Sequence, residues 1–546
     1  MPLTRRSLME TGGIAAFLTA AAACSRPDQK AATDLADLDA VETASRIKSG
    51  ELSAAEAVGA AVERSKRINE KINAIATPTY EAAEAQAASA AGAMGGVPTF
   101  VKDLYDVTGV PTGFGSRAFP GYKGGEQVPF VTAFLNLGVV SIGKSTSPEF
   151  GLSATTESLA TGKTRNPWNL NHSTGGSSGG AGALVASGVV PIAHASDGGG
   201  SIRIPASCCG TVGLKVSRGR TPSGERDEGA PISLVSHGVE SRTVRDTAAV
   251  SAAMALPASE SGLHPLDLVT APGKDRRRIA LVTLGLGGRE PDASVKEATQ
   301  KAGEMCASLG HHVEETVFPI PEAFGQDFSL YWASFAAQVV TAWEAATKLP
   351  RNPLAFEPFT LGLAAVFEAN KAQFADAIAR LKTVEGMMAA MHENYDIILS
   401  PVLSSPPPEI GWLDGGLDYD TLIGRLVDYV QYTSPTTSPA RRRFRCRCRC
   451  RRKGCRLGRC SARRSAARTC CSNSLSSLRK RCPGRAGNGG VRIKTLSLVR
   501  SLILSRLRSH QSGSRAIAVD RNQSAFYSEQ INQVPVGIKC RLKWAA

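Results

Sequence analysis

The stretch "GGSSGGAGALVASGVVPIAHASDGGGSIRIPASCCGTVGLK", residues 175–215, is the most informative part of this chain. Two glycine-dense segments stand at either side of a β-branched apolar run. Neither has the composition of a linker, because apolar residues rather than Pro, Gln or Glu surround both. A glycine-dense turn inside apolar sequence instead predicts backbone N–H groups that are aimed at a ligand.

Outward from this stretch, strand-like and helix-like patterns alternate. Short β-branched runs occur at 96–107, 138–145 and 187–197, separated by turns and helical patches. Residues 34–86 have apolar positions at helical spacing, with Ser53 as a candidate N-cap and Glu56 three places on. Helical patterns return over 286–437, where residues 395–411 add one apolar strand and a Pro-rich turn. Strands alternating with helices predict an α/β fold.

Three residues in these segments could carry chemistry: Lys102, Ser177 and Ser201. Taken singly they have ordinary explanations, a solvated lysine and two Gly/Ser loops. A serine nucleophile needs a base and donors that hold an oxyanion, and consecutive N–H groups of Gly198, Gly199, Gly200 and Ser201 suit an oxyanion hole. The body has no G-x-S-x-G motif and its histidines lie in no triad motif. Lysine is therefore the favoured base, which requires burial that favours its neutral form.

Residues 175–215 resemble the amidase signature family, whose members hydrolyse carboxamides through a Ser, cis-Ser, Lys triad. The resemblance covers roughly residues 35–437. It implies one large domain with a mixed β-sheet core covered by helices on both faces, a small-molecule amide substrate, and neither cofactor nor metal. The segments 165–180, 197–207 and 213–220 are most similar to the branch that contains cyclic-amide and nylon-oligomer hydrolases.

The same resemblance assigns roles to single residues. Ser201 would be the acyl nucleophile, Ser177 the bridging serine in a cis peptide, and Lys102 the base. The 24-residue spacing from Ser177 to Ser201 agrees with the family pattern. Asp197 and Arg203, which flank the glycine turn, would brace the nucleophile loop, and an ordinary salt bridge between them is compatible with that role.

A rival motif lies at residues 138–145, where "GVVSIGKS" satisfies the phosphate-loop pattern G-x-x-x-x-G-K-[ST] of an NTPase. Its context argues against this alternative. A phosphate loop follows a strand and opens a helix, whereas residues 129–138 have a helical pattern and residues 139–142 form the strand themselves.

The first thirty residues predict a twin-arginine export signal. Arg5 and Arg6 precede a short apolar run at 12–23, which is too short for the roughly 20 residues that cross a bilayer. We therefore expect an exported, periplasmic or otherwise extracytoplasmic protein that contacts the membrane only transiently. Lipid attachment at Cys24 is a less favoured alternative, since no Leu stands three places before it.

The tail from residue 438 differs from the rest of the chain. Residues 1–440 carry 36 Lys+Arg and 46 Asp+Glu, whereas residues 441–546 carry 28 and 2. Nine of the thirteen cysteines also lie in the tail, in runs such as "RCRCRC" at 445–450. A basic tail could bind nucleic acid, but such arms do not need cysteine, and the spacing suits no zinc site.

The genetic code offers another explanation of the tail. Arg-Cys repeats read from the third base of each codon become Leu, Met or Val alternating with Ser or Pro. From Ala440 this frame allows "APAVSLPLSL", and from 453–458 "GLPIG", both similar to the C-terminal region of the amidase signature family. We therefore expect an amidase signature domain at 31–437 that is C-terminally incomplete, and a disordered tail at 438–546 translated out of frame, with no specific nucleic-acid partner.

Overall fold

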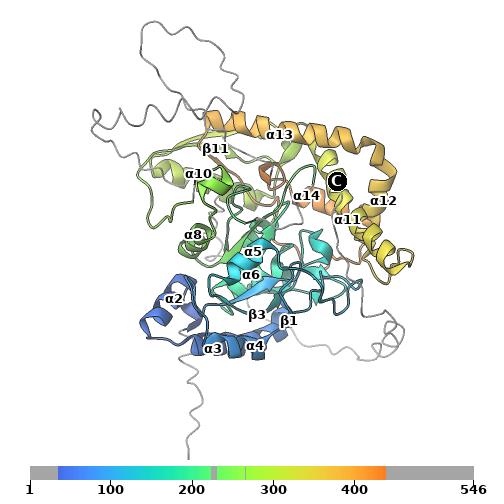
Figure 1. Cartoon of the computed structure of the whole chain (residues 1–546). Helices are drawn as coiled ribbons and strands as arrows, with labels where there is room; N and C mark the ends of the chain where they lie inside the picture. Colours follow the sequence, from blue (N-terminus) through green and yellow to red (C-terminus); the bar gives the residue numbers. More distant parts are fainter. Residues whose placement is uncertain (1–34, 223–229, 265, 438–546) are drawn as a thin grey trace, which may run out of the picture.

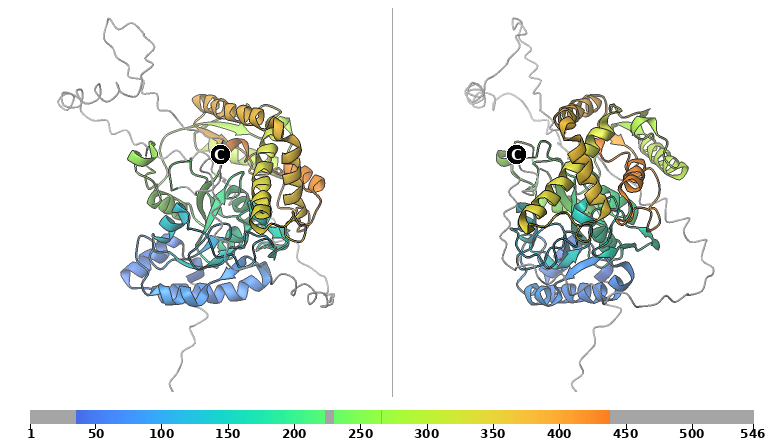
Figure 2. Two further views of the ribbon diagram at one scale, coloured as in Figure 1. Left: turned by 45° about the vertical axis from the view of Figure 1, so that its right-hand side comes forward. Right: turned by 90° about the vertical axis from the view of Figure 1, so that its right-hand side faces the viewer.

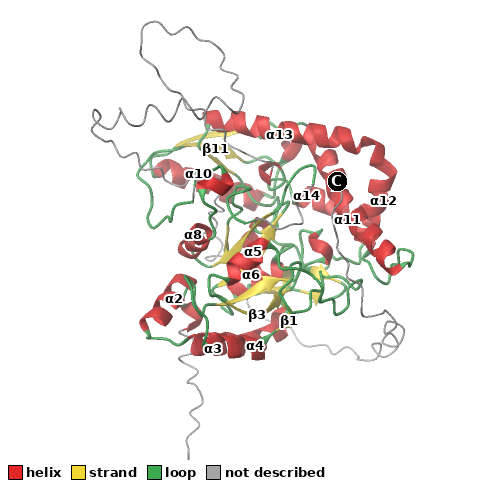
Figure 3. Cartoon of the chain, viewed as in Figure 1, coloured by secondary structure: helices red, strands yellow, loops and turns green. Residues whose placement is uncertain are grey.

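The computed structural model describes residues 35–222, 230–264 and 266–437, which form an α/β domain (Figures 1 and 3). The predicted export signal and the Arg/Cys-rich tail lie outside the described residues. Helices alternate with strands along the described chain, as the sequence pattern predicts. The α-helices are α2 (Ala40–Ser49), α3 (Ala54–Ile72), α4 (Tyr80–Ala87), α5 (Pro129–Leu135), α6 (Gly179–Ala186), α7 (Arg203–Cys209), α8 (Val244–Ala253), α9 (Ala258–Ser261), α10 (Ala293–Ser308), α11 (Phe324–Thr347), α12 (Pro358–Asn370), α13 (Phe374–Asn394) and α14 (Tyr419–Tyr429).

The β core is divided into three three-stranded sheets, with two short hairpins beside them, in the described part of the chain. The sheet orders are β1-β3-β2, β8-β10-β9 and β12-β11-β13. The strands of these sheets are β1 (Ile75–Pro78), β2 (Pro98–Lys102), β3 (Val140–Ser145), β8 (Ile192–Asp197), β9 (Val212–Gly213), β10 (Ser236–Ser241), β11 (Arg278–Val282), β12 (His312–Thr316) and β13 (Ile397–Leu399). The hairpins pair β4 (Glu157–Ser158) with β5 (Gly162–Lys163), and β6 (Arg165–Asn166) with β7 (Asn169–Ser173).

Parallel and antiparallel pairing are mixed, as predicted. β3 pairs antiparallel with β1 and parallel with β2, while β11 is parallel to both of its neighbours. β8 and β10 are antiparallel over six residues, with Asp197 opposite Ser236. Strands β2 and β8 pack side by side without a shared ladder, and Thr99 of β2 donates through Oγ1 to the carbonyl of Ile192 at 3.0 Å. This contact brings the ends of two different sheets together.

Helices cover both faces of the β1-β3-β2 sheet. Figure 1 shows α3 and α4 on one side and α5 and α6 on the other. Helix α3 begins with a capping box, in which Ser53 Oγ accepts from the Glu56 N–H and the Glu56 carboxylate accepts from the Ser53 N–H. Val58 and Val62 of α3 are fully buried in one cluster with Phe100 of β2. The apolar spacing read from the sequence is therefore the buried face of this helix.

Residues 138–145 do not form a phosphate loop. The segment from Val140 is strand β3, which follows helix α5 and precedes the short 3-10 helix η1 (Glu149–Gly151). Lys144 is 1% exposed, donates to Thr112 Oγ1 at 2.9 Å, and lies 3.3 Å from a carboxylate oxygen of Asp103. A buried ammonium needs such partners, so the contacts of Lys144 with Thr112 and Asp103 give this lysine a structural role. This arrangement excludes the phosphate-loop alternative.

The longer helices form the opposite part of the domain. Helix α11 packs against α12 and α13, and Figure 2 shows these helices together on the side away from α3 and α4. Tyr331 and Val340 of α11 are buried, as are Leu363 of α12 and Val384 of α13. No helix in the described ranges is long and apolar enough to span a membrane.

Candidate active site

Lys102 lies at the end of β2 and is fully buried. Its Nζ donates to Ser177 Oγ at 2.8 Å and to Ser196 Oγ at 3.2 Å. Because Ser196 is on β8, the contact between β2 and β8 fixes the position of this amine. A lysine amine in direct contact with a serine hydroxyl is the arrangement that proton transfer requires.

Ser177 stands just before α6 and is 2% exposed. The peptide bond between Gly176 and Ser177 is cis. The glycines around it are required by close backbone packing: a Cβ on Gly176 would lie 2.1 Å from the Thr155 carbonyl oxygen, and one on Gly180 would lie 2.5 Å from the Thr146 backbone nitrogen. These Gly/Ser residues form a tightly packed turn and not a linker.

The second glycine segment is the turn between β8 and α7. Asp197 ends β8, Gly198, Gly199 and Gly200 form the turn, and Ser201 follows at 8% exposure. Gly200 has φ of +145°, and a Cβ there would lie 2.5 Å from Thr433 Oγ1, so only glycine fits. Within the described chain, no backbone N–H from Gly198 to Ser201 donates to a backbone or side-chain acceptor. These donors remain available to a ligand oxygen.

The hydrogen bond between Lys102 and Ser177 has no counterpart from Ser177 to Ser201 among the described residues. Catalytic hydrogen bonds are often long in free enzymes and shorten when substrate binds. The lack of a hydrogen bond between Ser177 and Ser201 is therefore compatible with a proton relay through these two serines.

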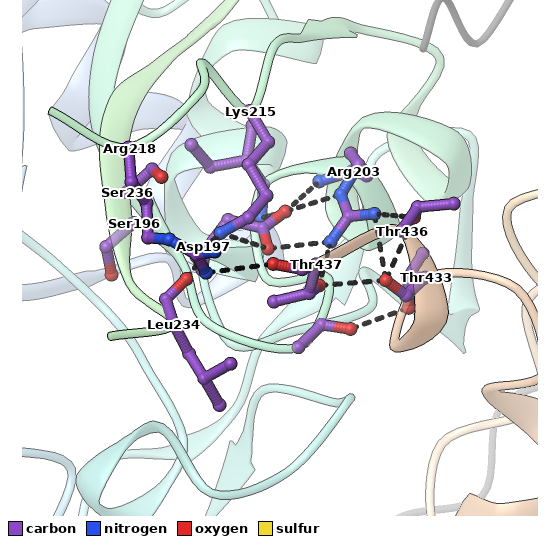
Figure 4. A network of polar contacts seen from close by, with 12 residues as sticks. Ser196, Asp197, Arg203, Lys215, Arg218, Leu234, Ser236, Thr433, Thr436 and Thr437 are labelled. Carbon is purple, nitrogen blue, oxygen red and sulfur yellow. Dashed lines mark hydrogen bonds and ion pairs between the residues drawn. The ribbon is translucent and has the colours of Figure 1, made fainter. Parts of the chain in front are cut away.

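Asp197 and Arg203 form a buried bidentate ion pair beneath the turn (Figure 4). Arg203 Nε and Nη2 each donate to one Asp197 carboxylate oxygen at 2.8 Å. Lys215 Nζ lies 3.5 Å from the same carboxylate and also donates to the Leu234 carbonyl. Burial alone would raise the pKa of the Asp197 carboxyl, but the charges of Arg203 and Lys215 hold that pKa well below its usual value. The pair therefore stays ionised and fixes both ends of the turn.

The guanidinium of Arg203 also holds the last described segment of the chain. Its Nη1 donates to the Thr433 carbonyl at 3.0 Å and to Thr436 Oγ1 at 2.6 Å, and its Nη2 donates to Thr437 Oγ1 at 2.9 Å (Figure 4). Thr433 in turn donates through Oγ1 to the Gly199 carbonyl at 2.6 Å. The glycine turn that precedes Ser201 thus depends on residues that stand more than 200 positions later.

Two histidines extend the polar network from Lys102. The Lys102 N–H donates to His194 Nδ1 at 3.3 Å, and His194 Nε2 lies 3.2 Å from His237 Nδ1. Burial and the neighbouring His237 hold the pKa of His194 well below its usual value. His194 is therefore neutral at pH 7, and because its Nδ1 accepts, its proton is on Nε2.

The structure joins Lys102 to Ser177 and places Ser201 in the turn after β8, the strand whose Ser196 also contacts Lys102. It also adds other residues to the site. Sequence reasoning missed Ser196, His194 and His237, because strand residues carry no motif beyond their apolar alternation. It also missed Phe328 and Trp332 of α11, whose rings lie against Gly198 and Gly199. No group of three or more His, Cys, Asp or Glu side chains in the described residues could hold a metal ion.

Comparison with known proteins gives one consistent result. The family model described as "Amidase" matches residues 56–441. The "Putative amidase AmiC" of Mycobacterium bovis is 40% identical over 403 residues, which cover 73% of this chain and 85% of that protein. The 6-aminohexanoate-cyclic-dimer hydrolase of Paenarthrobacter ureafaciens is 33% identical over 404 residues, covering 69% and 79%. The structure of a bacterial aryl acylamidase of the amidase signature enzymes is similar, with a TM-score of 0.67, 26% identity, and coverage of 74% and 88%.

Proposed function

This chain belongs to the amidase signature family and is a hydrolase that acts on amides, and we propose that it cleaves a carbon–nitrogen bond through an acyl-enzyme on Ser201. In this scheme Ser177 is the bridging serine and Lys102 is the base. The observation that carries the proposal is the buried 2.8 Å hydrogen bond from Lys102 Nζ to Ser177 Oγ, beside the glycine turn that holds Ser201. The substrate is a small-molecule amide, and no cofactor takes part.

Acylation begins with neutral Lys102. Lys102 Nζ accepts the proton of Ser177 as Ser177 Oγ accepts the proton of Ser201, and Ser201 Oγ attacks the amide carbon. The carbonyl oxygen becomes an oxyanion, for which the N–H groups from Gly198 to Ser201 are the proposed donors. When the tetrahedral intermediate collapses, the C–N bond breaks and the proton returns through Ser177 to the leaving nitrogen. An amine leaves, and the acyl group stays on Ser201 as an ester.

Deacylation uses the same relay, with a water molecule in the place that Ser201 has during acylation. A water molecule attacks the ester carbon and gives its proton through Ser177 to Lys102, and a second oxyanion forms at the glycine turn. Collapse breaks the bond to Ser201 Oγ, which recovers its proton through the relay. A carboxylic acid is released, and Lys102 is neutral again.

Asp197 and Arg203 support this chemistry without touching the reacting atoms. Their ion pair spans the glycine turn and, through Thr433, Thr436 and Thr437, links it to the last described segment. Donors that are fixed before substrate arrives need no reorganisation during the reaction. We assign both residues to positioning of the nucleophile loop.

Ser201→Ala tests the nucleophile assignment. We expect hydrolysis of a panel of carboxamides to fall by about 10³-fold or more, because the acyl-enzyme cannot form. Ser187→Ala is the matched control, since among the described residues the Ser187 hydroxyl donates only to the carbonyls of Ala183 and Leu184 in the preceding helix turn. Both variants are compared by amine release in the full chain and in a protein made from a gene with the frame restored after codon 437. Retained activity in Ser201→Ala would refute the assignment.

The proposal extends to the C-terminal region. We infer that the chain from about residue 438 is translated out of frame and that restoring the frame raises activity. The support is that the family match ends at residue 441, where the excess of arginine and cysteine begins. The nucleotide sequence around codon 437 from an independent isolate decides it, because an intact frame that encodes the Arg-Cys codons contradicts the inference.

Location is a separate proposal. Arg5, Arg6 and the apolar run at 12–23 support export through the twin-arginine route, with lipid attachment at Cys24 as the lesser alternative. Replacing both arginines by lysine should keep the protein in the cytoplasmic fraction of a host with this pathway. Unchanged fractionation would contradict the export assignment.

A further inference from the structure

Aromatic side chains form a row along one face of α11. Phe324, Phe328 and Trp332 are spaced by four residues, so they share a helix face. Phe324 and Phe328 have ring centroids 5.7 Å apart at an interplanar angle of 28°, and Phe328 and Trp332 have centroids 5.9 Å apart at 16°. This geometry is a stacked row.

The last two rings of this row lie against the glycine turn. A Cβ on Gly198 would lie 3.4 Å from Trp332 Cη2 and Cζ3, and one on Gly199 would lie 3.6 Å from Phe328 Cζ. Both rings thus face the two glycines that precede Ser201 by three and two positions, at a distance where an added side-chain carbon would touch them. Phe328 and Trp332 are partly exposed, whereas Phe324 is 5% exposed.

Trp332 is held in place. Its indole Nε1 donates to the Leu152 carbonyl at 2.9 Å, and its ring meets that of Phe335 edge to face with centroids 5.8 Å apart. Asp327, the charged residue next to Phe328 on α11, is neutralised by Arg380 of α13, which donates two hydrogen bonds to its carboxylate. The surface beside the turn is therefore a fixed, uncharged aromatic wall.

We propose that Phe328 and Trp332 determine substrate specificity by stacking with a flat apolar group that flanks the scissile carbonyl. This inference rests on the proposed function of Ser201. A ring-bearing amide places its π-face against these rings and removes apolar surface from water, while a carboxylate at that position loses hydration without gaining a partner. Aromatic amides are accordingly the preferred substrate class over short aliphatic amides and anionic amides.

The test compares kcat/KM of the full chain for benzamide, acetanilide, acetamide and succinamate. We expect at least one ring-bearing amide to be favoured over both acetamide and succinamate by about 10-fold or more, the scale on which apolar pockets discriminate. Trp332→Leu should remove most of that preference, and Trp332→Phe should retain part of it. Phe328→Leu should act in the same direction.

Trp343→Leu is the matched control. Trp343 is on the same helix and likewise donates its Nε1 to a backbone carbonyl, that of Ala118 at 3.2 Å, but it packs with Phe356. It should lower stability and leave the substrate preference unchanged. Thermal melting of all variants identifies any that fail to fold, and Trp332→Phe keeps the test valid if Trp332→Leu is one of them.

The two proposals fail in different ways. If Ser201→Ala hydrolyses amides as well as the parent chain does, the proposed function is wrong. If hydrolysis needs Ser201 but shows no ring preference, or keeps that preference in Trp332→Leu and Phe328→Leu, the specificity inference is wrong. For a parent chain without turnover, calorimetric titration of benzamide and acetanilide into Ser201→Ala and into Ser201→Ala with Trp332→Leu gives the same comparison, and equal affinities would overturn the inference.

Discussion

The two sides of the site are held by different forces. The catalytic layer, residues 96–215, contains buried polar groups that are fixed by hydrogen bonds, such as Lys102 with Ser177 and Asp197 with Arg203. The helical cover, α11 to α13, is held largely by apolar contacts, and its ion pairs use exposed arginines, as in Arg380 with Asp327 and Arg351 with Glu344. Substitutions at the buried polar positions of the catalytic layer should therefore be tolerated less well than substitutions that keep the apolar periodicity of the cover.

The largest expected effect comes from replacing each of the two buried lysines of the catalytic layer, Lys102 and Lys144. Lys102→Met preserves side-chain length and removes the base, so kcat/KM for amides should fall by about 10³-fold. Lys144→Met removes a structural partner of Asp103, so the free energy of unfolding should fall by about 3 kcal/mol while kcat of the folded protein changes little. Amine release and urea denaturation separate the two results, and equal losses of kcat would show that neither lysine has a specific role.

A second comparison uses one substitution in both regions. Gly200→Ala places a Cβ 2.5 Å from Thr433 Oγ1 at a φ of +145°, and we expect it to lower the free energy of unfolding by about 3 kcal/mol. Gly386 lies within α13, is exposed, and would have no atom within 4 Å of an added Cβ, so Gly386→Ala should raise the free energy of unfolding by about 1 kcal/mol. Urea denaturation measures both changes. Destabilisation of equal size would show that glycine is no more strictly required at the turn of the catalytic layer than in the helical cover.

The contact between the two regions should depend on pH. Glu357 is the N-cap of α12 in the helical cover, and Glu149 belongs to η1 in the catalytic layer. The Glu149 carboxylate accepts a hydrogen bond from the Glu357 backbone N–H at 2.8 Å. Burial and the charge of Glu149 raise the pKa of Glu357 to about 8 from an ordinary value of 4.5. Between these two pKa values the folded chain holds a proton on Glu357 that the unfolded chain has lost. The stabilisation of the folded state by this proton is therefore complete below about pH 4.5 and is lost as the pH rises through about 8.

We therefore expect the parent chain to lose about 2 kcal/mol of unfolding free energy between pH 6 and pH 8 from this group. Glu357→Gln keeps an acceptor for the Leu159 N–H and should flatten that part of the profile. Glu344→Gln on α11 is the control and should leave this range unchanged, because hydrogen bonds from Arg351 hold the pKa of Glu344 below its ordinary value of 4.5. If the unfolding free energy of the parent chain and that of Glu357→Gln changed with pH in parallel, protonation of Glu357 would not be the cause of the pH dependence.

The sequence is more informative about the catalytic layer than about the cover for a physical reason. Ser177 and Ser201 stand in recognisable motifs because each adjoins a glycine turn that accepts few residues, as the close contacts of Gly176 and Gly200 show. The capping box at Ser53 and Glu56 was readable because both partners lie within one helix turn. The division of the β core into three sheets was not readable, since strand periodicity does not tell which strands pair.

Taken alone, the amino-acid sequence predicted the α/β class and the family, which the fold and the comparisons confirm, and it proposed three candidate catalytic residues through the family resemblance. Only the tertiary structure decided that Lys144 is a buried partner of Asp103, that Thr433 to Thr437 brace the glycine turn before Ser201 through Arg203, and that Phe328 and Trp332 face its glycines. These contacts join residues that are tens to hundreds of positions apart. Packing of the whole chain creates them, and no short stretch of sequence encodes them.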